Sequence, residues 1–410
     1  MEQKTLFKKN FAWNSLGIGF NSLSSLFFLI IITRVIGVYE AGLFTITFSM
    51  ALVLNTIALY AGRLFQVTDT QYVVRDREYI VNRAISCLAM LLVALLLVLI
   101  QGYSMERALI LLSLCLFRVL ESFADVYYGI LQRQEKLYIS GISLTVKATV
   151  GILVFLFASM FTNSILWACF SLVLVNLLVL VCYDIRQCKV YVKDKSPLLF
   201  KNVFSVFKDG FFIFANAFLA LYILNAPRFA IDNHLSYDMQ AIFGYIMMPA
   251  TVIVLFTQFI LMPFMNQIRV TYEFQNKRKL QNIIFKIGAL ILAFGVLACV
   301  LAYLLGPEVL GFIYGVDLYA QRLHLVLILV GNIFYAISYV LLILLTTMRK
   351  TWIQFIIFAI TLILAYFISD YLVVSRQIEG ASMAVLITLG VQFVLYVLVA
   401  TIYMVRFPPA

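Results

Sequence analysis

Long apolar segments separated by short polar breaks repeat along the whole chain. Twelve of them are candidate membrane-spanning helices: residues 11–33, 41–62, 84–100, 108–128, 139–160, 165–183, 211–229, 241–265, 283–305, 323–346, 352–370 and 381–404. A helix rises about 1.5 Å per residue, so about 20 apolar residues cross the hydrocarbon layer of a bilayer. Segments such as 84–100 and 283–305 are apolar on every side, whereas the strands of a transmembrane barrel alternate in polarity. The pattern therefore predicts an all-α polytopic membrane protein of about twelve helices.

The composition and the distribution of charge agree with this reading and orient the helices. The chain is 64% hydrophobic and 12% charged, which excludes a soluble enzyme. If the N-terminus is cytoplasmic, most of the 30 Lys and Arg residues fall on the inner side, while acids outnumber bases outside. Basic residues are retained in the cytoplasm, so both termini are expected there. The net charge of +11 then reflects topology, and it gives no reason to expect nucleic acid as a partner.

The longest basic connection divides the twelve segments into two sets of six. This predicts an N-terminal lobe over 1–183, a cytoplasmic linker over 184–208 and a C-terminal lobe over 209–410. Two halves that enter the membrane from the same side are the parallel kind of internal repeat that some transporters use. Each half also places an arginine, Arg34 or Arg228, at the outer end of its first segment.

Cysteine and histidine give no sign of a cofactor. Five of the six cysteines fall inside predicted segments, where they are expected to pack, and Cys188 lies on the cytoplasmic side. His234 and His324 are the only two histidines, and neither has neighbours at metal-ligand spacing. We therefore expect no disulfide framework, no metal site and no cofactor.

Charged residues within the predicted spans are the strongest candidates for a site. Arg118, Glu121 and Asp125 fall within an arc of about 60° on one helix face, which must meet protein or water. Lys147, in the next span, is expected at the same depth as Glu121. One interpretation is a structural ion pair between Glu121 and Lys147. The other, which we favour because intramembrane charges usually mark function, is a water-filled cavity in which Arg118 and Lys147 hold an anionic substrate.

Asparagines and prolines within the spans suggest a polar and bent interior. Asn14 and Asn21 share one side of the first span, and Asn216 lies in the seventh. Such residues can line an aqueous path, and they can equally form hydrogen bonds between helices. Pro249 and Pro263 in the eighth span each remove a backbone donor and predict bends, which suit either a moving gate or a static kink.

Several short segments resemble a known family, the bacterial polysaccharide flippases of the MATE-like multidrug/oligosaccharidyl-lipid/polysaccharide exporter superfamily. The resemblance covers most of the chain and rests on the layout of the spans together with a set of weak motifs. These are KKNFAWNSLG at 8–17, RVIGVYEAGLF at 34–44, DVYYG at 125–129 with Gln132, NAPRFAID at 225–232, and MPATVI at 248–253 with 259–263.

The resemblance implies a two-lobed, MATE-like helical bundle in the bacterial cytoplasmic membrane. Such a protein would carry undecaprenyl-pyrophosphate-linked oligosaccharide from the inner to the outer leaflet for surface polysaccharide synthesis, without covalent chemistry. It would contact membrane lipids and would be a candidate partner of the polysaccharide polymerase machinery. The family's cavity cations correspond best to Arg34, Arg118, Lys147 and Arg228, although Arg34 and Arg228 fit equally well as outer-interface anchors.

The force that drives transport is open at this point. A proton, Na⁺ or the membrane potential could each drive it, and Glu121 and Asp125 are the candidates for ion coupling. A MATE-like multidrug antiporter would share the fold, and the presence of the same two carboxylates leaves this function as an alternative. A polysaccharide polymerase or ligase would need a larger outer loop than the one expected over 306–321. A major-facilitator transporter would carry a glycine-and-basic loop signature that residues 62–83 lack.

Overall fold

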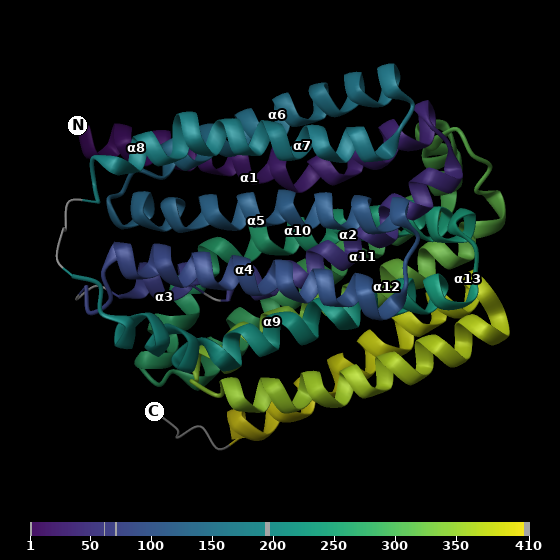
Figure 1. The fold of residues 1–410 in the computed structure, drawn as a ribbon. Coiled ribbons are helices and arrows are strands. Elements are labelled where there is room, and N and C mark those ends of the chain that lie inside the picture. The colour runs from purple at the N-terminus through teal and green to yellow at the C-terminus, as the bar shows by residue number, and fades with distance from the viewer. Residues whose placement is uncertain (1, 61, 70–71, 193–196, 406–410) are drawn as a thin grey trace. The chain divides into compact units, whose positions relative to one another are not determined.

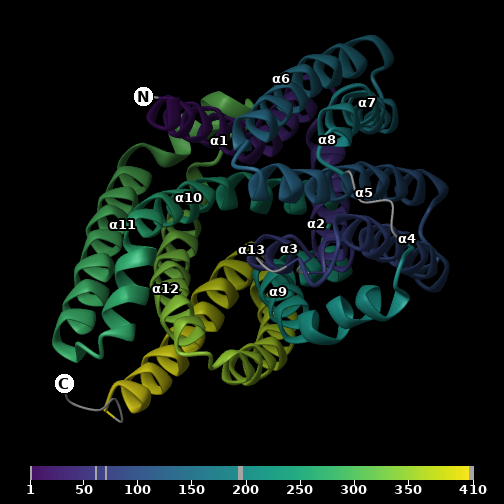
Figure 2. The same cartoon turned by 90° about the vertical axis from the view of Figure 1, so that its left-hand side faces the viewer.

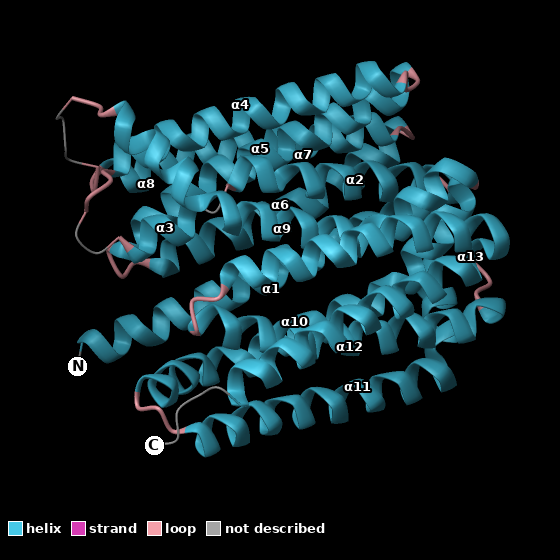
Figure 3. Ribbon diagram, turned by 90° about the horizontal axis from the view of Figure 1, so that it is seen from below, coloured by secondary structure: helices cyan, strands magenta, loops and turns pink. Residues whose placement is uncertain are grey.

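The protein is helical along nearly its whole length (Figure 1; Figure 3). The computed structural model describes residues 2–60, 62–69, 72–192 and 197–405. Within these ranges every regular element is a helix, so the prediction of an all-α polytopic protein is confirmed. The chain divides into two compact units, Met1–Phe218 (the N-terminal unit) and Leu219–Ala410 (the C-terminal unit).

In the N-terminal unit, the central helix is α5, which packs against α2, α4 and α7 (Figure 2). The elements of this unit are α1 (Glu2–Val35), α2 (Val38–Leu59), α3 (Gly62–Thr68), α4 (Asp76–Gln101), α5 (Met105–Arg133), α6 (Leu137–Thr162), α7 (Ile165–Val179), a π-helix (Leu180–Asp184), α8 (Ile185–Lys189) and the first part of α9 (Phe200–His234). The short helix α3 was not anticipated from the apolar pattern.

α1 packs along α6 because glycines at the crossing let the two backbones approach closely. A Cβ atom added at Gly17 would lie 2.5 Å from the carbonyl oxygen of Gly141. Asn10 fixes one end of this pair of helices. Its amide donates to the carbonyl of Glu135 at 2.7 Å and accepts from the N–H of Tyr138 at 2.9 Å. α1 is thereby attached to the turn that joins α5 to α6.

The beginning of α9 is attached to the N-terminal unit by polar and aromatic contacts. The buried carboxylate of Glu78 accepts hydrogen bonds from the N–H of Leu199 at 3.1 Å and from the amide of Asn202 at 2.9 Å. Further along the helix, the ring of Phe214 stacks on Tyr60 with centroids 4.5 Å apart. α9 is therefore held at two levels against the connection between α2 and α4.

In the C-terminal unit, α12 is the central helix and packs against α10, α11 and α13. The elements of this unit are the rest of α9, α10 (Tyr237–Glu273), α11 (Lys277–Tyr314), a 3₁₀ turn (Tyr319–Gln321), α12 (Arg322–Thr347) and α13 (Thr351–Val405). α13 is broken at Gln377, where φ is 53° and ψ is −125°. The break falls between the last two predicted spans, so both of those spans lie in α13.

The structure accounts for each of the twelve predicted spans. Ten helices of the described chain are long and apolar enough to cross a membrane, with α13 counted once. α5 is not among them because Arg118, Glu121 and Asp125 make its central stretch too charged. The long outer loop expected over 306–321 was wrong, because α11 continues to Tyr314. The lobes and linker remain a prediction, and helices extend into the linker as far as Lys189 and from Phe200 onward.

Candidate functional site

A polar cavity of about 250 Å³ lies inside the N-terminal unit. Its walls come from α1, α2, α3, α5 and α6. The lining residues are Asn21, Asn55, Leu59, Arg63, Arg118, Glu121, Ser122, Asp125, Tyr128, Leu144 and Lys147. Five of them, Asn21, Arg118, Glu121, Asp125 and Lys147, belong to the set of candidate site residues drawn from the sequence. The structure brings these five together around one space.

Arg118 and Glu121 form an ion pair along one face of α5. The Nη1 atom of Arg118 lies 2.6 Å from Oε2 of Glu121, one helical turn further on. The guanidinium also lies over the ring of Phe48 on α2, 4.5 Å from its centroid. Arg118 is roughly 20 Å from either end of α5, so this charge sits at the middle of the helix, where a bare guanidinium would be most costly.

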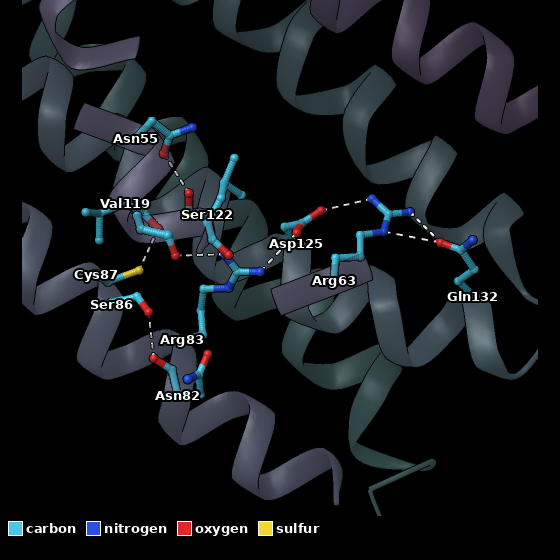
Figure 4. A network of polar contacts seen from close by, with 12 residues as sticks. Asn55, Arg63, Asn82, Arg83, Ser86, Cys87, Val119, Ser122, Asp125 and Gln132 are labelled. Carbon is cyan, nitrogen blue, oxygen red and sulfur yellow. Dashed lines mark hydrogen bonds and ion pairs between the residues drawn. The ribbon is translucent and has the colours of Figure 1, made fainter. Parts of the chain in front are cut away.

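Asp125 is shared by two arginines from different elements (Figure 4). Arg63 on α3 approaches one carboxylate oxygen at 2.9 Å, and Arg83 on α4 approaches the other at 3.2 Å. Arg83 is 2% exposed and also donates to the carbonyls of Ala58 and Leu59, both at 2.8 Å. It thus satisfies carbonyls that the end of α2 leaves unbonded. Two guanidiniums on a single carboxylate leave the cluster with excess positive charge.

Lys147 forms the most deeply buried ion pair of the site. Its Nζ atom lies 2.6 Å from Oδ2 of Asp184, and the two side chains are 4% and 1% exposed. The ammonium also donates to the hydroxyl of Tyr128 at 3.0 Å, which in turn is 2.9 Å from the hydroxyl of Ser143. Asp184 ends the π-helix, a form that occurs mostly as single turns inside α-helices, often at functional sites.

The pairing within the cavity differs from the first interpretation of the sequence. Lys147 is paired with Asp184 instead of Glu121, and Glu121 is paired with Arg118. Glu121 and Lys147 do line the same cavity, but the partner of Lys147 is Asp184, the first residue of the predicted linker. Four cationic side chains line the cavity or pair with its lining residues, against three carboxylates. These are Arg63, Arg83, Arg118 and Lys147, with Glu121, Asp125 and Asp184.

The other candidate residues lie elsewhere. Asn14 is half-buried on α1, where its backbone nitrogen faces Gly141 of α6, and Arg34 is exposed in the last turn of the same helix. Asn216 is half-buried on α9 within the N-terminal unit. Arg228 is half-buried in the C-terminal unit and donates to the side chain of Asn225 at 3.0 Å. Their role in substrate binding stays a prediction.

Three charged residues of the site were missed from the sequence. Arg63 and Arg83 are among the basic residues expected on the cytoplasmic side, and Asp184 is the first residue of the predicted linker. Each directly follows or precedes an apolar segment, so each can be carried into the bundle by a short extension of a helix. Their position beside long apolar runs was the available signal. Among the described residues, no cluster of His, Cys, Asp and Glu is arranged to hold a metal ion.

Comparison with known proteins places this architecture in a recognised class. No protein-family model matches the sequence. The capsular polysaccharide biosynthesis protein CapF of Staphylococcus aureus is 23% identical over 270 residues, which cover 64% of this chain and 67% of the relative. The sequence is therefore only distantly similar to a protein of capsule synthesis.

The similarity of fold is more extensive. The lipid II flippase MurJ superposes with a TM-score of 0.73 at 15% identity, covering 95% of this chain and 87% of that one. An inward-facing multidrug resistance MATE family transporter of the MOP superfamily gives a TM-score of 0.67 at 12% identity, with 96% and 98% covered. The chain is thus a multi-pass membrane protein with the fold of MATE-like transporters and flippases.

Proposed function

We propose that this protein is a flippase of the bacterial cytoplasmic membrane. Its substrate would be an undecaprenyl-pyrophosphate-linked oligosaccharide, carried from the cytoplasmic to the outer leaflet for capsule or other surface polysaccharide synthesis. The observation that carries the proposal is the cationic cavity of the N-terminal unit, with its excess of guanidinium and ammonium groups over carboxylates. The fold shared with MurJ and the distant similarity to CapF support the same class of substrate.

The physical problem of such transport matches the chemistry of the cavity. A pyrophosphate and several sugars cannot enter about 30 Å of hydrocarbon unless other polar groups replace their water. Arg63 and Arg118 can donate paired hydrogen bonds to phosphate oxygens, and Lys147 can act as a point charge. The amides of Asn21 and Asn55 and the hydroxyl groups of the wall can bond sugar hydroxyls. The polyprenyl chain would remain among the lipids.

In this mechanism the carboxylates act as exchangeable partners. A phosphate that enters the cavity competes with Asp125 for Arg63, which is the more exposed of the two arginines at 32% of its side chain. Arg83 keeps its backbone partners at the end of α2 and stays in place. When phosphate binds an arginine in place of its carboxylate, that carboxylate loses its counter-charge. Asp125 or Glu121 could then accept a proton or Na⁺, and substrate binding would be coupled to ion binding. No covalent bond is made or broken, so the protein would not act as an enzyme.

The decisive experiment labels lipid-linked oligosaccharide separately in the two leaflets of cells depleted of this protein. The proposal expects precursor to accumulate in the cytoplasmic leaflet and to reach the outer leaflet again when the protein is restored. An Arg118→Ala, Lys147→Ala double variant should fail to restore export. Because it also leaves Glu121 and Asp184 unpaired, its amount in the membrane is measured beside export. Removal of two exposed cations, Arg278→Ala with Lys279→Ala, is the matched control and should restore it.

A multidrug antiporter is the second candidate, because Glu121 and Asp125 line the same cavity and the fold is that of MATE transporters. The same depleted cells separate the two functions. Unchanged lipid-linked precursors together with increased sensitivity to cationic drugs would favour the antiporter and would contradict the flippase.

A further inference from the structure

A second charged pocket lies in the C-terminal unit, where α10 and α12 end. It has a volume of about 780 Å³. Arg269 and Glu273 come from the last turns of α10, Thr346 and Thr347 from the last turn of α12, and Arg349 from the turn that follows. The helix ends that meet here also carry Lys277, Arg278 and Lys279, so this is the end of the unit predicted to be cytoplasmic.

The pocket is lined by two arginines, Arg269 and Arg349, and by one carboxylate, that of Glu273. Nε of Arg269 donates to Oε1 of Glu273 at 3.1 Å, which uses one edge of that guanidinium. The guanidinium of Arg349 forms no hydrogen bond or ion pair with the side chains that the structure describes. The pocket therefore carries a net positive charge, and it offers several N–H donors to an incoming anion.

The backbone holds Arg349 in a conformation that usually selects glycine. Its φ is 57°, in the left-handed region, at the position after a helix where glycine is most common. The turn is closed by the N–H of Arg349 on the carbonyl of Thr346 and by the N–H of Lys350 on that of Leu345, both at 2.9 Å. The amide of Gln354 on α13 braces the same corner by donating to the hydroxyl of Thr346 at 2.9 Å. A long cationic side chain is therefore held at a backbone position that usually favours glycine, which has no side chain.

The pocket is apolar at one edge and polar at the other. Met265 and Ile343 lie one turn deeper than Arg269 and Thr347 on their helices. The charged pocket combines a surface for hydrocarbon with donors for an anion, which is the chemistry of a phospholipid at the membrane interface.

We propose that this pocket binds the phosphate group of an anionic lipid head group in the leaflet predicted to be cytoplasmic. Arg269 and Arg349 bond the phosphate oxygens, and Met265 and Ile343 contact the first carbons of the acyl chains. None of its lining residues belongs to the cavity of the N-terminal unit, and the proposal does not depend on the nature of the transported substrate. A lipid held here would anchor the α10–α12 end to one leaflet.

The test titrates the purified full-length protein with phosphatidylglycerol, with phosphatidylcholine of the same chains and with inorganic phosphate, and counts bound molecules by native mass spectrometry. The proposal expects phosphatidylglycerol to bind more tightly than phosphatidylcholine. The Arg269→Gln, Arg349→Gln double variant should weaken phosphatidylglycerol binding about tenfold or more, the equivalent of losing one charge-assisted hydrogen bond. The control variant, Arg278→Gln with Lys279→Gln, removes the same charge outside the pocket and should change it less than about twofold.

Each arm of this titration supports or overturns the proposal. Equal affinity of the double variant and the control would overturn it, as would equal binding of the two lipids. Displacement of phosphatidylglycerol by an equal concentration of inorganic phosphate would show a site for the free anion and contradict the lipid assignment. Unchanged phosphatidylcholine binding and an unchanged elution volume of the double variant show that it remains folded.

Discussion

Lys147 and Asp184 place two full charges where almost no water reaches them. Removing one partner of such a pair leaves the other charge buried and uncompensated, which typically costs about 3–5 kcal/mol. We therefore expect Lys147→Met and Asp184→Asn each to lower the thermal unfolding temperature of the purified protein substantially. The double variant Lys147→Met, Asp184→Met should recover most of that loss, because two apolar side chains need no counter-charge.

Export separates the structural role of this pair from its functional role. If Lys147 binds substrate, the double variant should be stable and still inactive in leaflet-resolved labelling. A double variant that is both stable and fully active would show that the pair serves packing alone, and Lys147 would leave the list of substrate-binding candidates.

The partners of the charged side chains are the part of the structure that the sequence predicts least completely. Arg118, Glu121 and Asp125 could be placed on one face because helical periodicity fixes their angular positions. Their partners could not, because Arg63, Arg83 and Asp184 come from separate elements that only tertiary packing brings to the cavity. A polar residue beside a long apolar run can extend the helix inward or end it, and the local sequence is the same in both cases.

The close contact between α1 and α6 predicts different effects on stability for substitutions at two glycines of α1. Gly17→Ala should destabilise the protein by about 1–3 kcal/mol, because the new methyl group overlaps the backbone at Gly141. Gly19 is two residues away on the same helix, and a Cβ there would meet nothing within 4 Å. Gly19→Ala should therefore be neutral or slightly stabilising. Thermal unfolding of the two variants checks the prediction, and equal effects would show that the helices are not packed this closely.

Helices were the part of the structure most readily predicted. Each of the twelve apolar segments lies mostly in a described helix, because a bilayer leaves the backbone few other ways to satisfy its hydrogen bonds. The ends of the helices were harder to predict from the sequence. α11 runs past its predicted end to Tyr314 through Gly306 and Pro307, which read as a loop in the sequence. The break at Gln377 was placed correctly as a gap, although its geometry was not foreseen.

At the scale of the whole molecule, the distribution of basic residues predicts which helix ends face the cytoplasm. Phe274, in the turn between α10 and α11, is 77% exposed, and Phe312, at the opposite end of α11, is 83% exposed. In a cysteine-free background, Phe312→Cys should react in intact cells with a thiol reagent that cannot cross membranes. Phe274→Cys should react only after the cells are permeabilised. The reverse pattern would invert the topology and place the proposed lipid site at the outer leaflet.

The π-helix between α7 and α8 is a place where the chain should be able to lose one residue and keep its fold. A π turn accommodates one residue more than the α-helix around it, so the helices on either side keep their alignment. Deleting the exposed Cys182 would convert this turn to ordinary α-helix and leave Asp184 and the buried Cys188 near their present positions. The same deletion in the middle of α5 would rotate the rest of that helix by about 100° and scatter the cavity charges. A single-codon deletion scan should therefore show a narrow tolerant window at 180–183 inside an otherwise intolerant bundle.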